Sequence, residues 1–192
     1  MPKNRLEAFS DGVLAIIITI MVLELKAPHA GSWHALGPLL LPLCSYLVSF
    51  IYIGIYWNNH HHMFAATRKV SGGVLWANLH LLFWLSLFPF VTSWISETEL
   101  ALWPTVAYGV VLLLAAIAYF ILQNVIIAAQ GDDSLLARAI GRDTKGKLSP
   151  PIYAVAIGAA WIHPWLSAAL YVVVALIWLV PDRRIERRIT PE

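Results

Sequence analysis

The stretch RLEAFSDGVLAIIITIMVLELK, residues 5–26, decides how this chain folds. Charged residues stand at both of its ends, and from Gly12 to Leu23 the only polar side chain is that of Thr19. As an α-helix, residues 8–25 extend over about 27 Å, close to the thickness of the hydrocarbon core of a bilayer. Asp11 lies about one turn inside the apolar part. Because a carboxylate is costly to bury in lipid, Asp11 requires a polar partner and is a candidate functional residue.

Composition predicts an integral membrane protein. The chain has 192 residues, of which 59% are hydrophobic and only 12% are charged. A typical soluble domain carries about twice that share of charged residues. The single cysteine, Cys44, cannot form an internal disulfide, so redox chemistry is not expected. No feature of the sequence indicates a nucleic-acid partner.

Six apolar segments follow one another, and we expect one all-α domain, residues 1–192, with six transmembrane helices. The predicted spans are residues 6–26, 36–60, 74–95, 101–129, 151–163 and 165–181. Pro150 and Pro151 are expected to open the fifth span. Residues 134–140, in the polar stretch before it, are expected to form a short surface helix.

The distribution of positive charge predicts the orientation. With six spans, twelve of the 13 lysines and arginines fall on the side that holds both termini, and Lys26 alone falls on the other. The twelve are Lys3, Arg5, Arg68, Lys69, Arg138, Arg142, Lys145, Lys147, Arg183, Arg184, Arg187 and Arg188. By the positive-inside rule, both termini are cytoplasmic in a multi-pass protein of the cell membrane.

Polar side chains inside the predicted spans gather near their cytoplasmic ends. They are Ser10 and Asp11 in the first span, residues 58–62 in the second, Asn78 and His80 in the third, and Gln123 and Asn124 in the fourth. Polar groups that are buried in lipid need partners. We therefore expect a hydrogen-bonded cluster that ties these helices together.

Three consecutive histidines, residues 60–62, raise the question of a metal site. Neighbours on a helix point about 100° apart, so the three rings cannot all face one ion. A structural or interfacial role is expected, with no metal and no cofactor. The sequence also lacks the His-Glu-x-x-His and Gly-x-Ser-x-Gly motifs of hydrolases and the Thr-Val-Gly-Tyr-Gly filter of familiar potassium channels.

Helical geometry separates two sides of the first helix. Ile16, Ile20 and Leu23 fall on one stripe, with Thr19 at its edge, whereas Asp11 falls on the other side. The stripe either lines a path for a solute or simply faces lipid and neighbouring helices. Because the helix is apolar all round, periodicity alone does not choose between these interpretations.

Three groups of residues resemble a known family. The run Arg5-x-x-x-Phe9-Ser10-Asp11, with Gly12 and the following AIIIT, resembles the signature of the prokaryotic branch of the transmembrane protein 175 family of potassium channels. Trp57-x-x-His60-His61-x-x-Phe64 resembles the family at the end of the second span. In the third span, Asn78, Leu85 and Pro89-Phe90 do so as well.

The resemblance implies a homotetramer in a lipid bilayer, with four copies of the first helix around a pore for monovalent cations. Carried over by position, the pore is narrowed by Ile16, Ile20 and Leu23, with Thr19 beside them. A supporting network then comprises Arg5, Phe9, Ser10, Asp11, Trp57, His60, His61 and Asn78. The implied function is passive, selective permeation of potassium.

Two other classes of protein stay open at this point. The first is a proton-coupled carrier or an intramembrane metal enzyme that uses Asp11, the histidines of residues 60–62 and His80. The second is a membrane assembly factor that conducts nothing. Carriers usually show paired repeats and broken helices. The first span has no internal proline, and its one glycine lies near its start, which favours the channel.

Overall fold

The computed structural model describes residues 2–29, 31–131, 134–140 and 144–179, and all regular secondary structure in these residues is helical. The elements are α1 (Lys3–Leu23), the 3₁₀ helix η1 (Trp33–Leu39), α2 (Leu40–Ala65), α3 (Gly72–Ser86), α4 (Phe88–Glu97), α5 (Leu102–Gln130), α6 (Leu135–Ile140), α7 (Thr144–Ala159) and α8 (Pro164–Leu179). The predicted all-α class is confirmed. The predicted end of the sixth span, residue 181, lies outside the described residues. The four arginines near the end of the chain also lie outside them.

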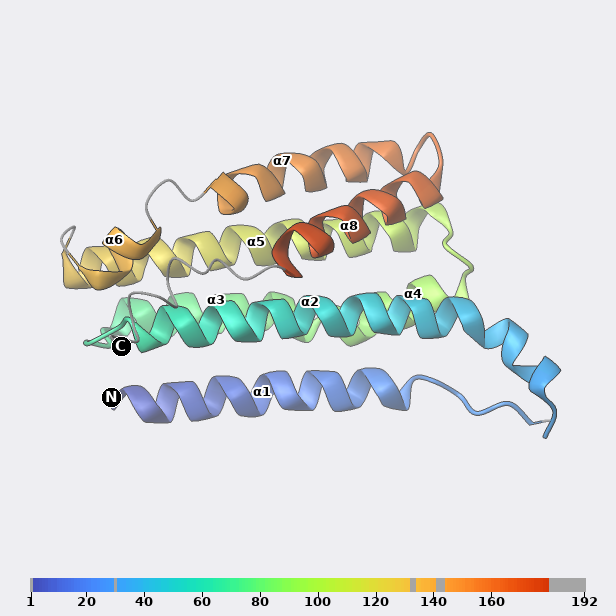
Figure 1. The fold of residues 1–192 in the computed structure, drawn as a ribbon, viewed down its shortest axis with the longest axis horizontal. Helices are drawn as coiled ribbons and strands as arrows, with labels where there is room; N and C mark the ends of the chain where they lie inside the picture. Colours follow the sequence, from blue (N-terminus) through green and yellow to red (C-terminus); the bar gives the residue numbers. More distant parts are fainter. Residues whose placement is uncertain (1, 30, 132–133, 141–143, 180–192) are drawn as a thin grey trace.

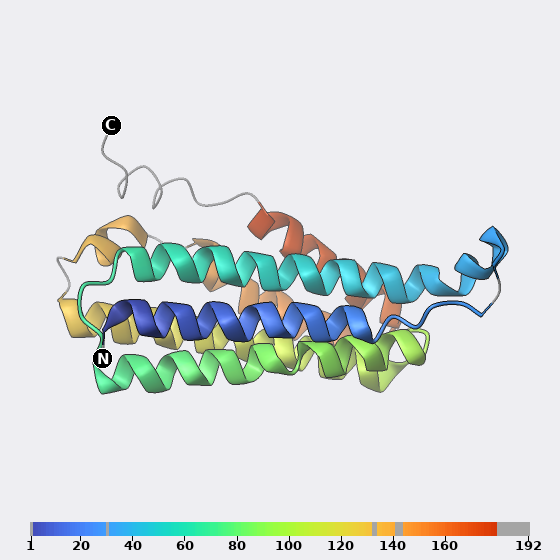
Figure 2. The same cartoon turned by 90° about the horizontal axis from the view of Figure 1, so that it is seen from below.

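The long helices run side by side in one bundle (Figure 1). α1 packs against α2, α3 and α4, whereas α7 packs against α5 and α8. In Figure 2, α1 lies between α2 and α3, and no other helix covers its side toward the viewer. The start of α1, the end of α2, the start of α3 and the end of α5 share one end of the bundle, here called the N-terminal end.

Four helical stretches within the described residues are long and apolar enough to cross a membrane. They are Lys3–Leu23, Trp33–Ala65, Gly72–Glu97 and Leu102–Gln130, and α8 is a shorter apolar helix. The first three predicted spans differ from these stretches by two to five residues at each end. α1 ends at Leu23 rather than at residue 26, and α2 continues to Ala65 rather than ending at residue 60.

A proline divides the third predicted span. The sequence predicts one helix over residues 74–95, but α3 ends at Ser86 and α4 begins at Phe88. In a continuous helix, the ring of Pro89 would crowd the carbonyl of Leu85 and could not donate a hydrogen bond to it. Helical hydrogen bonding resumes at Val91, whose amide donates to the Leu87 carbonyl at 3.1 Å.

The helix that contains the fifth predicted span begins before that span does. α7 starts at Thr144, so Pro150 and Pro151 lie inside the helix and do not open it, which makes that expectation wrong. The first turns of α7 are polar, and hydrophobic periodicity detects only the apolar part of a helix. The Ser149 hydroxyl donates a hydrogen bond to the Lys145 carbonyl in these turns, at 2.9 Å.

α5 forms the centre of the core. Its fully buried apolar side chains are Leu112, Ala115, Ala118, Leu122 and Ile126. Small residues among them let neighbouring helices approach closely, as is common in membrane bundles. The closest approach is at Gly109, where an added Cβ would overlap the ring and hydroxyl of Tyr171 and the side chain of Ile157. α5 is therefore held between α3 on one side and the pair α7 and α8 on the other.

Candidate permeation path and its polar support

α1 has one buried side. Its buried residues are Leu6, Ser10, Leu14, Ile17 and Met21, which recur every three or four positions and so share one side of the helix. That side packs on α2, α3 and α4. The remaining surface of α1 is open in the single chain (Figure 2).

The candidate constriction residues lie on this open surface. Ile16, Ile20 and Leu23 expose 59%, 42% and 78% of their surfaces. Their spacing of four and then three residues places them on one stripe about 11 Å long. Thr19 is exposed beside them, and its Oγ1 donates to the Ile16 carbonyl at 2.9 Å. A stripe of large apolar side chains this exposed is typical of a surface that lipid or another chain covers.

A buried chain of hydrogen bonds joins α1 to α2 and α3 at the N-terminal end. His60 Nε2 contacts Asn78 Oδ1 at 2.8 Å, and Asn78 Nδ2 donates to Ser10 Oγ at 3.0 Å. Ser10 Oγ in turn donates to the Leu6 carbonyl at 2.9 Å. Because the Asn78 oxygen can only accept, Nε2 of His60 carries the proton. No buried side-chain nitrogen or oxygen atom of the described residues lacks a partner, as the interior of a membrane protein requires.

Asp11 does not join that chain but lies beside it. Its Oδ1 accepts a hydrogen bond from Trp57 Nε1 at 3.0 Å, and both side chains are exposed in the single chain. The Trp57 ring stacks on the ring of His61, with centroids 6.4 Å apart. The carboxylate thus has its polar partner on α2, at the edge of the surface that faces away from the subunit.

Two residues of the expected network lie elsewhere. Arg5 is exposed and forms no ion pair with Asp11 in the described part of the chain. Phe9 is half exposed and lies seven residues before Ile16, which puts it on the same side of α1 as the stripe. Phe9 therefore extends the apolar stripe toward the N-terminal end.

The larger polar cluster expected from the sequence does not form. His80 accepts a hydrogen bond from Trp84 on the exposed surface of α3, and Asn124 donates to the Phe120 carbonyl of its own helix. The prediction grouped His80 and Asn124 with Ser10, His60 and Asn78 because all lie at a similar depth in the membrane. In the structure, the side chains of His80 and Asn124 lie on other sides of their helices. Among the residues that the structure describes, no group of three or more His, Cys, Asp or Glu could hold a metal ion.

A second polar network was missed by the sequence analysis. Ser49 on α2 contacts the Thr92 hydroxyl at 2.7 Å and the Tyr108 hydroxyl at 2.9 Å, which links α2 to α4 and α5. The hydroxyl of Tyr171 donates to the Thr105 carbonyl at 3.1 Å. Serine, threonine and tyrosine are common in apolar helices, so their side chains gave little signal. The spacing of Ser49 and Tyr52 on one side of α2 was the available clue.

Comparison with known proteins matches this architecture. A family model described as the endosomal/lysosomal potassium channel TMEM175 matches residues 5–89. A protein of Chryseobacterium sp. (strain P1-3) named as a potassium channel is 54% identical over 187 residues and covers 97% of each chain. One of Chamaesiphon minutus, also named as a potassium channel, is 33% identical over 188 residues and covers 90% of this chain and 91% of the relative.

The same organism provides a solved structure, described as the crystal structure of a lysosomal potassium-selective channel TMEM175 homolog. It matches with a TM-score of 0.82 at 28% sequence identity, over 94% of this chain and 97% of the other. The fold and its apolar helices thus define a multi-pass helical membrane protein of the ion-channel class, not an enzyme. The chain belongs to the TMEM175 family.

Proposed function

We propose that the protein is a potassium-selective channel that assembles as a homotetramer in the cell membrane. Four copies of α1 then surround a central pore through which potassium permeates passively, without a cofactor. Relatives that match nearly the whole chain are named as potassium channels, which supports a channel over a proton-coupled carrier. α1 also runs without a break from Lys3 to Leu23, unlike the broken helices typical of carriers.

The observation that carries the proposal is the contrast between the two sides of α1. Ile16, Ile20 and Leu23 are exposed, whereas Leu14 and Ile17 are buried against the same subunit. In a tetramer, the exposed stripe would form rings of apolar side chains around the axis. These rings offer no oxygen ligands, so an ion must lose part of its hydration shell to pass. Potassium loses water more readily than sodium, and a narrow apolar ring also gates by narrowing or dewetting.

The hydrogen bonds at the N-terminal end have a supporting role in this proposal. The chain of His60, Asn78 and Ser10 fixes α1 against α2 and α3, and the bond between Asp11 and Trp57 limits rotation of α1 about its axis. Fixed rotation matters because a turn of about 100° would replace each pore-facing residue by its neighbour in sequence. The network thus supports selectivity by holding the stripe toward the pore, without contacting the ion.

The proposed topology has six spans and cytoplasmic termini. α7 and α8 have 16 residues each, a length of about 24 Å, which reaches across most of the hydrocarbon core. Arg68 and Lys69 follow the end of α2 at the N-terminal end, and Lys145 and Lys147 begin α7. Positive charge at this end supports a cytoplasmic location for it.

Reconstituted liposomes test the function. Vesicles loaded with potassium should show an electrogenic potassium flux under a clamped voltage, with a smaller sodium flux and no need for a proton gradient. The Ile20→Trp variant should reduce the flux because the larger tryptophan side chain fills the narrow path. Ile117→Trp, the same change on the exposed surface of α5, serves as the control. A flux that requires a proton gradient would instead identify a carrier.

A further inference from the structure

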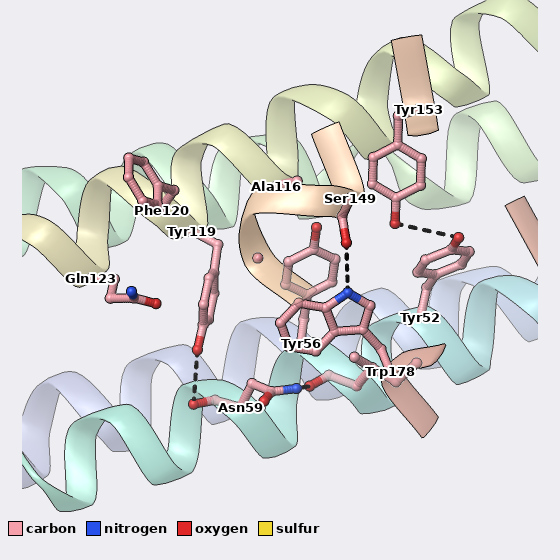
Figure 3. A pocket seen from close by; sticks show the side chains of 12 residues that line it. Tyr52, Tyr56, Asn59, Ala116, Tyr119, Phe120, Gln123, Ser149, Tyr153 and Trp178 are labelled. Atoms are coloured by element: carbon pink, nitrogen blue, oxygen red, sulfur yellow. Dashed lines mark hydrogen bonds between the residues drawn. The ribbon is translucent and has the colours of Figure 1, made fainter. Parts of the chain in front are cut away.

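Cavities in the bundle differ in how their walls are bonded. One cavity, between α2, α5, α7 and the end of α8, is shown in Figure 3 and has a volume of about 40 Å³. Hydrogen bonds connect its walls: Tyr119 donates to the Asn59 carbonyl, Tyr153 to the Tyr52 hydroxyl, and Trp178 to Ser149 (Figure 3). The helices around this cavity are thus tied directly to one another.

A larger cavity lies at the end of the bundle opposite the N-terminal end, where α2, α5 and α8 begin. Its volume is about 130 Å³. No residue of α1 lines it, so it is separate from the proposed pore. Most of its wall is apolar and includes Leu41, Val48, Ile95, Leu100, Ala168 and Val172.

The wall of this larger cavity offers little to a polar ligand. Three of its hydroxyl groups bond within the protein: Tyr108 contacts Ser49, Thr105 donates to the Ala101 carbonyl, and Tyr171 donates to the Thr105 carbonyl. No Asp, Glu, Lys, Arg or His of the described chain lines the cavity. Since no buried side-chain nitrogen or oxygen of the described residues lacks a partner, no such group requires a bound water here.

The cavity opens on the outer surface of the subunit. Three residues that line it are also exposed: Cys44 on α2, and Trp165 and Val172 on α8, which expose 58% and 37% of their surfaces. The helical stretches that contain α2 and α5 are long and apolar enough to cross a membrane. Lipid therefore reaches the mouth of the cavity.

An empty space of this size is unfavourable, because the atoms that line it lose packing contacts on one side. Packed interiors contain few voids larger than a water molecule. In another protein, an engineered apolar cavity of about 150 Å³ stays dry and takes up benzene or xenon. The occupant here should likewise be apolar, and the abundant apolar groups at this depth are the tails of lipids.

We propose that this cavity binds one acyl chain of a phospholipid of the outer leaflet. The chain enters between Cys44 and Trp165 and lies against Ala168, while the headgroup stays at the membrane surface. Because the wall is uncharged, the site selects the tail and not the headgroup. A bound tail fills the space between the first turns of α2 and α8. The inference goes beyond the proposed function, and its choice of leaflet follows from the proposed topology.

Photo-cross-linking in vesicles tests this site. The full chain is reconstituted in phosphatidylcholine vesicles that contain a small share of phosphatidylcholine with a diazirine in the upper half of one tail. After irradiation, mass spectrometry of peptides locates the modified residues. We expect residues 41–48 and 165–172 to be modified several times more than Trp103 and Val110. These two residues are exposed on the first turns of α5 but do not line the cavity.

Two adjacent positions on α8 separate the cavity from ordinary contact with lipid. Ala168→Phe places a ring in the cavity, so modification of residues 41–48 should fall to the level at Trp103 and Val110. Ala169→Phe is the matched control, because Ala169 is exposed and does not line the cavity, and it should change nothing.

The proposal fails if the Ala169→Phe protein shows no excess of modification at residues 41–48, as when a second copy of the chain covers the mouth. This result does not depend on the folding of Ala168→Phe. It also fails if Ala168→Phe keeps the full excess. Because the readout is the position of a cross-link, a protein that conducts no potassium would leave both comparisons intact.

Discussion

Asn78 is a single residue that connects three helices of the bundle. Its amide is fully buried and bonds to both Ser10 and His60, so it links three helices. Asn78→Leu should lower the free energy of unfolding by about 1–3 kcal/mol for each polar group that it leaves without a partner. Thermal unfolding in detergent measures this loss.

The matched control for Asn78 is Asn124→Leu. The Asn124 side chain is exposed and bonds only to a carbonyl of its own helix, so the same change should have little effect. Equal losses of stability in the two variants would show that the buried network contributes nothing beyond the helix propensity of leucine.

Ile16 tests which side of α1 faces the ions. Ile16→Asn supplies amide oxygens and admits water at the proposed narrowing, so conductance should rise and discrimination between potassium and sodium should fall. Unitary currents and reversal potentials in planar bilayers measure both effects.

Leu14 provides the comparison for Ile16. It is buried against the subunit, so Leu14→Asn should reduce stability without opening a path, because it places an unpaired amide in the packed interior. A gain of conductance in Leu14→Asn, together with unchanged permeation in Ile16→Asn, would assign the pore to the other side of the helix.

Sequence reasoning reached some residues and not others, for a physical reason. Ser10, His60 and Asn78 were proposed because polar groups in lipid require partners, and the structure brings these three together. The same rule grouped His80 and Asn124 with them wrongly, because depth in the membrane does not give rotation about a helix axis. Ser49 and Tyr108 were missed because hydroxyl groups are small parts of otherwise apolar positions.

Among the elements, α5 and α8 depend on one close contact. The ring of Tyr171 lies where the Cβ of any other residue at position 109 would be. Gly109→Ala should therefore separate α5 from α8 and reduce stability by about 1–3 kcal/mol, as overpacking usually does. Thermal unfolding of the purified protein measures the effect.

Gly54→Ala on α2 is the control for this contact, since its added Cβ would meet nothing within 4 Å apart from its chain neighbours and its own helix backbone. This variant should be neutral or slightly stabilising, because alanine favours a helix more than glycine does. A similar stability in both variants would mean that Tyr171 turns aside at no cost.

Helix bounds show what sequence patterns can and cannot give. The fourth predicted span, residues 101–129, nearly coincides with α5, Leu102–Gln130, because a long apolar segment has clear polar ends. α7 was placed wrongly because its polar first turns precede two prolines. Proline is usually a sign of a helix end, yet here the neighbouring helices hold the chain helical around it.

At the scale of the whole molecule, the proposed tetramer brings four copies of Leu23 close to one axis. In a Cys44→Ser background, Leu23→Cys should be linked efficiently into dimers and larger species by a short bismaleimide reagent. Denaturing gels of membranes treated before solubilisation measure the yield. The proximity follows from the exposed stripe on α1 and from the single copy of that helix in each chain.

Met21→Cys serves as the control for cross-linking. Met21 lies two residues away from Leu23 but is buried against its own subunit, so its thiol should react poorly and link little. Efficient linking at Met21 with none at Leu23 would contradict the central position of the stripe. A monomeric mass in native mass spectrometry of active protein would contradict the tetramer itself.

The hydrogen bonds that hold α1 are buried near its first turns and exposed near its last turn, so a tilt of the helix would turn about its start. The buried hydrogen bonds at Ser10 act as its pivot, while the bond from Ser93 to Glu24 and the ion pair between Lys26 and Glu97 at the far end are exposed and weak. Ile16 and Leu23 lie about 9 Å and 20 Å from that pivot along the helix. A tilt of α1 therefore moves Leu23 about twice as far as Ile16. In the proposed channel, small changes of this angle would act most strongly at Leu23 and least near Ser10.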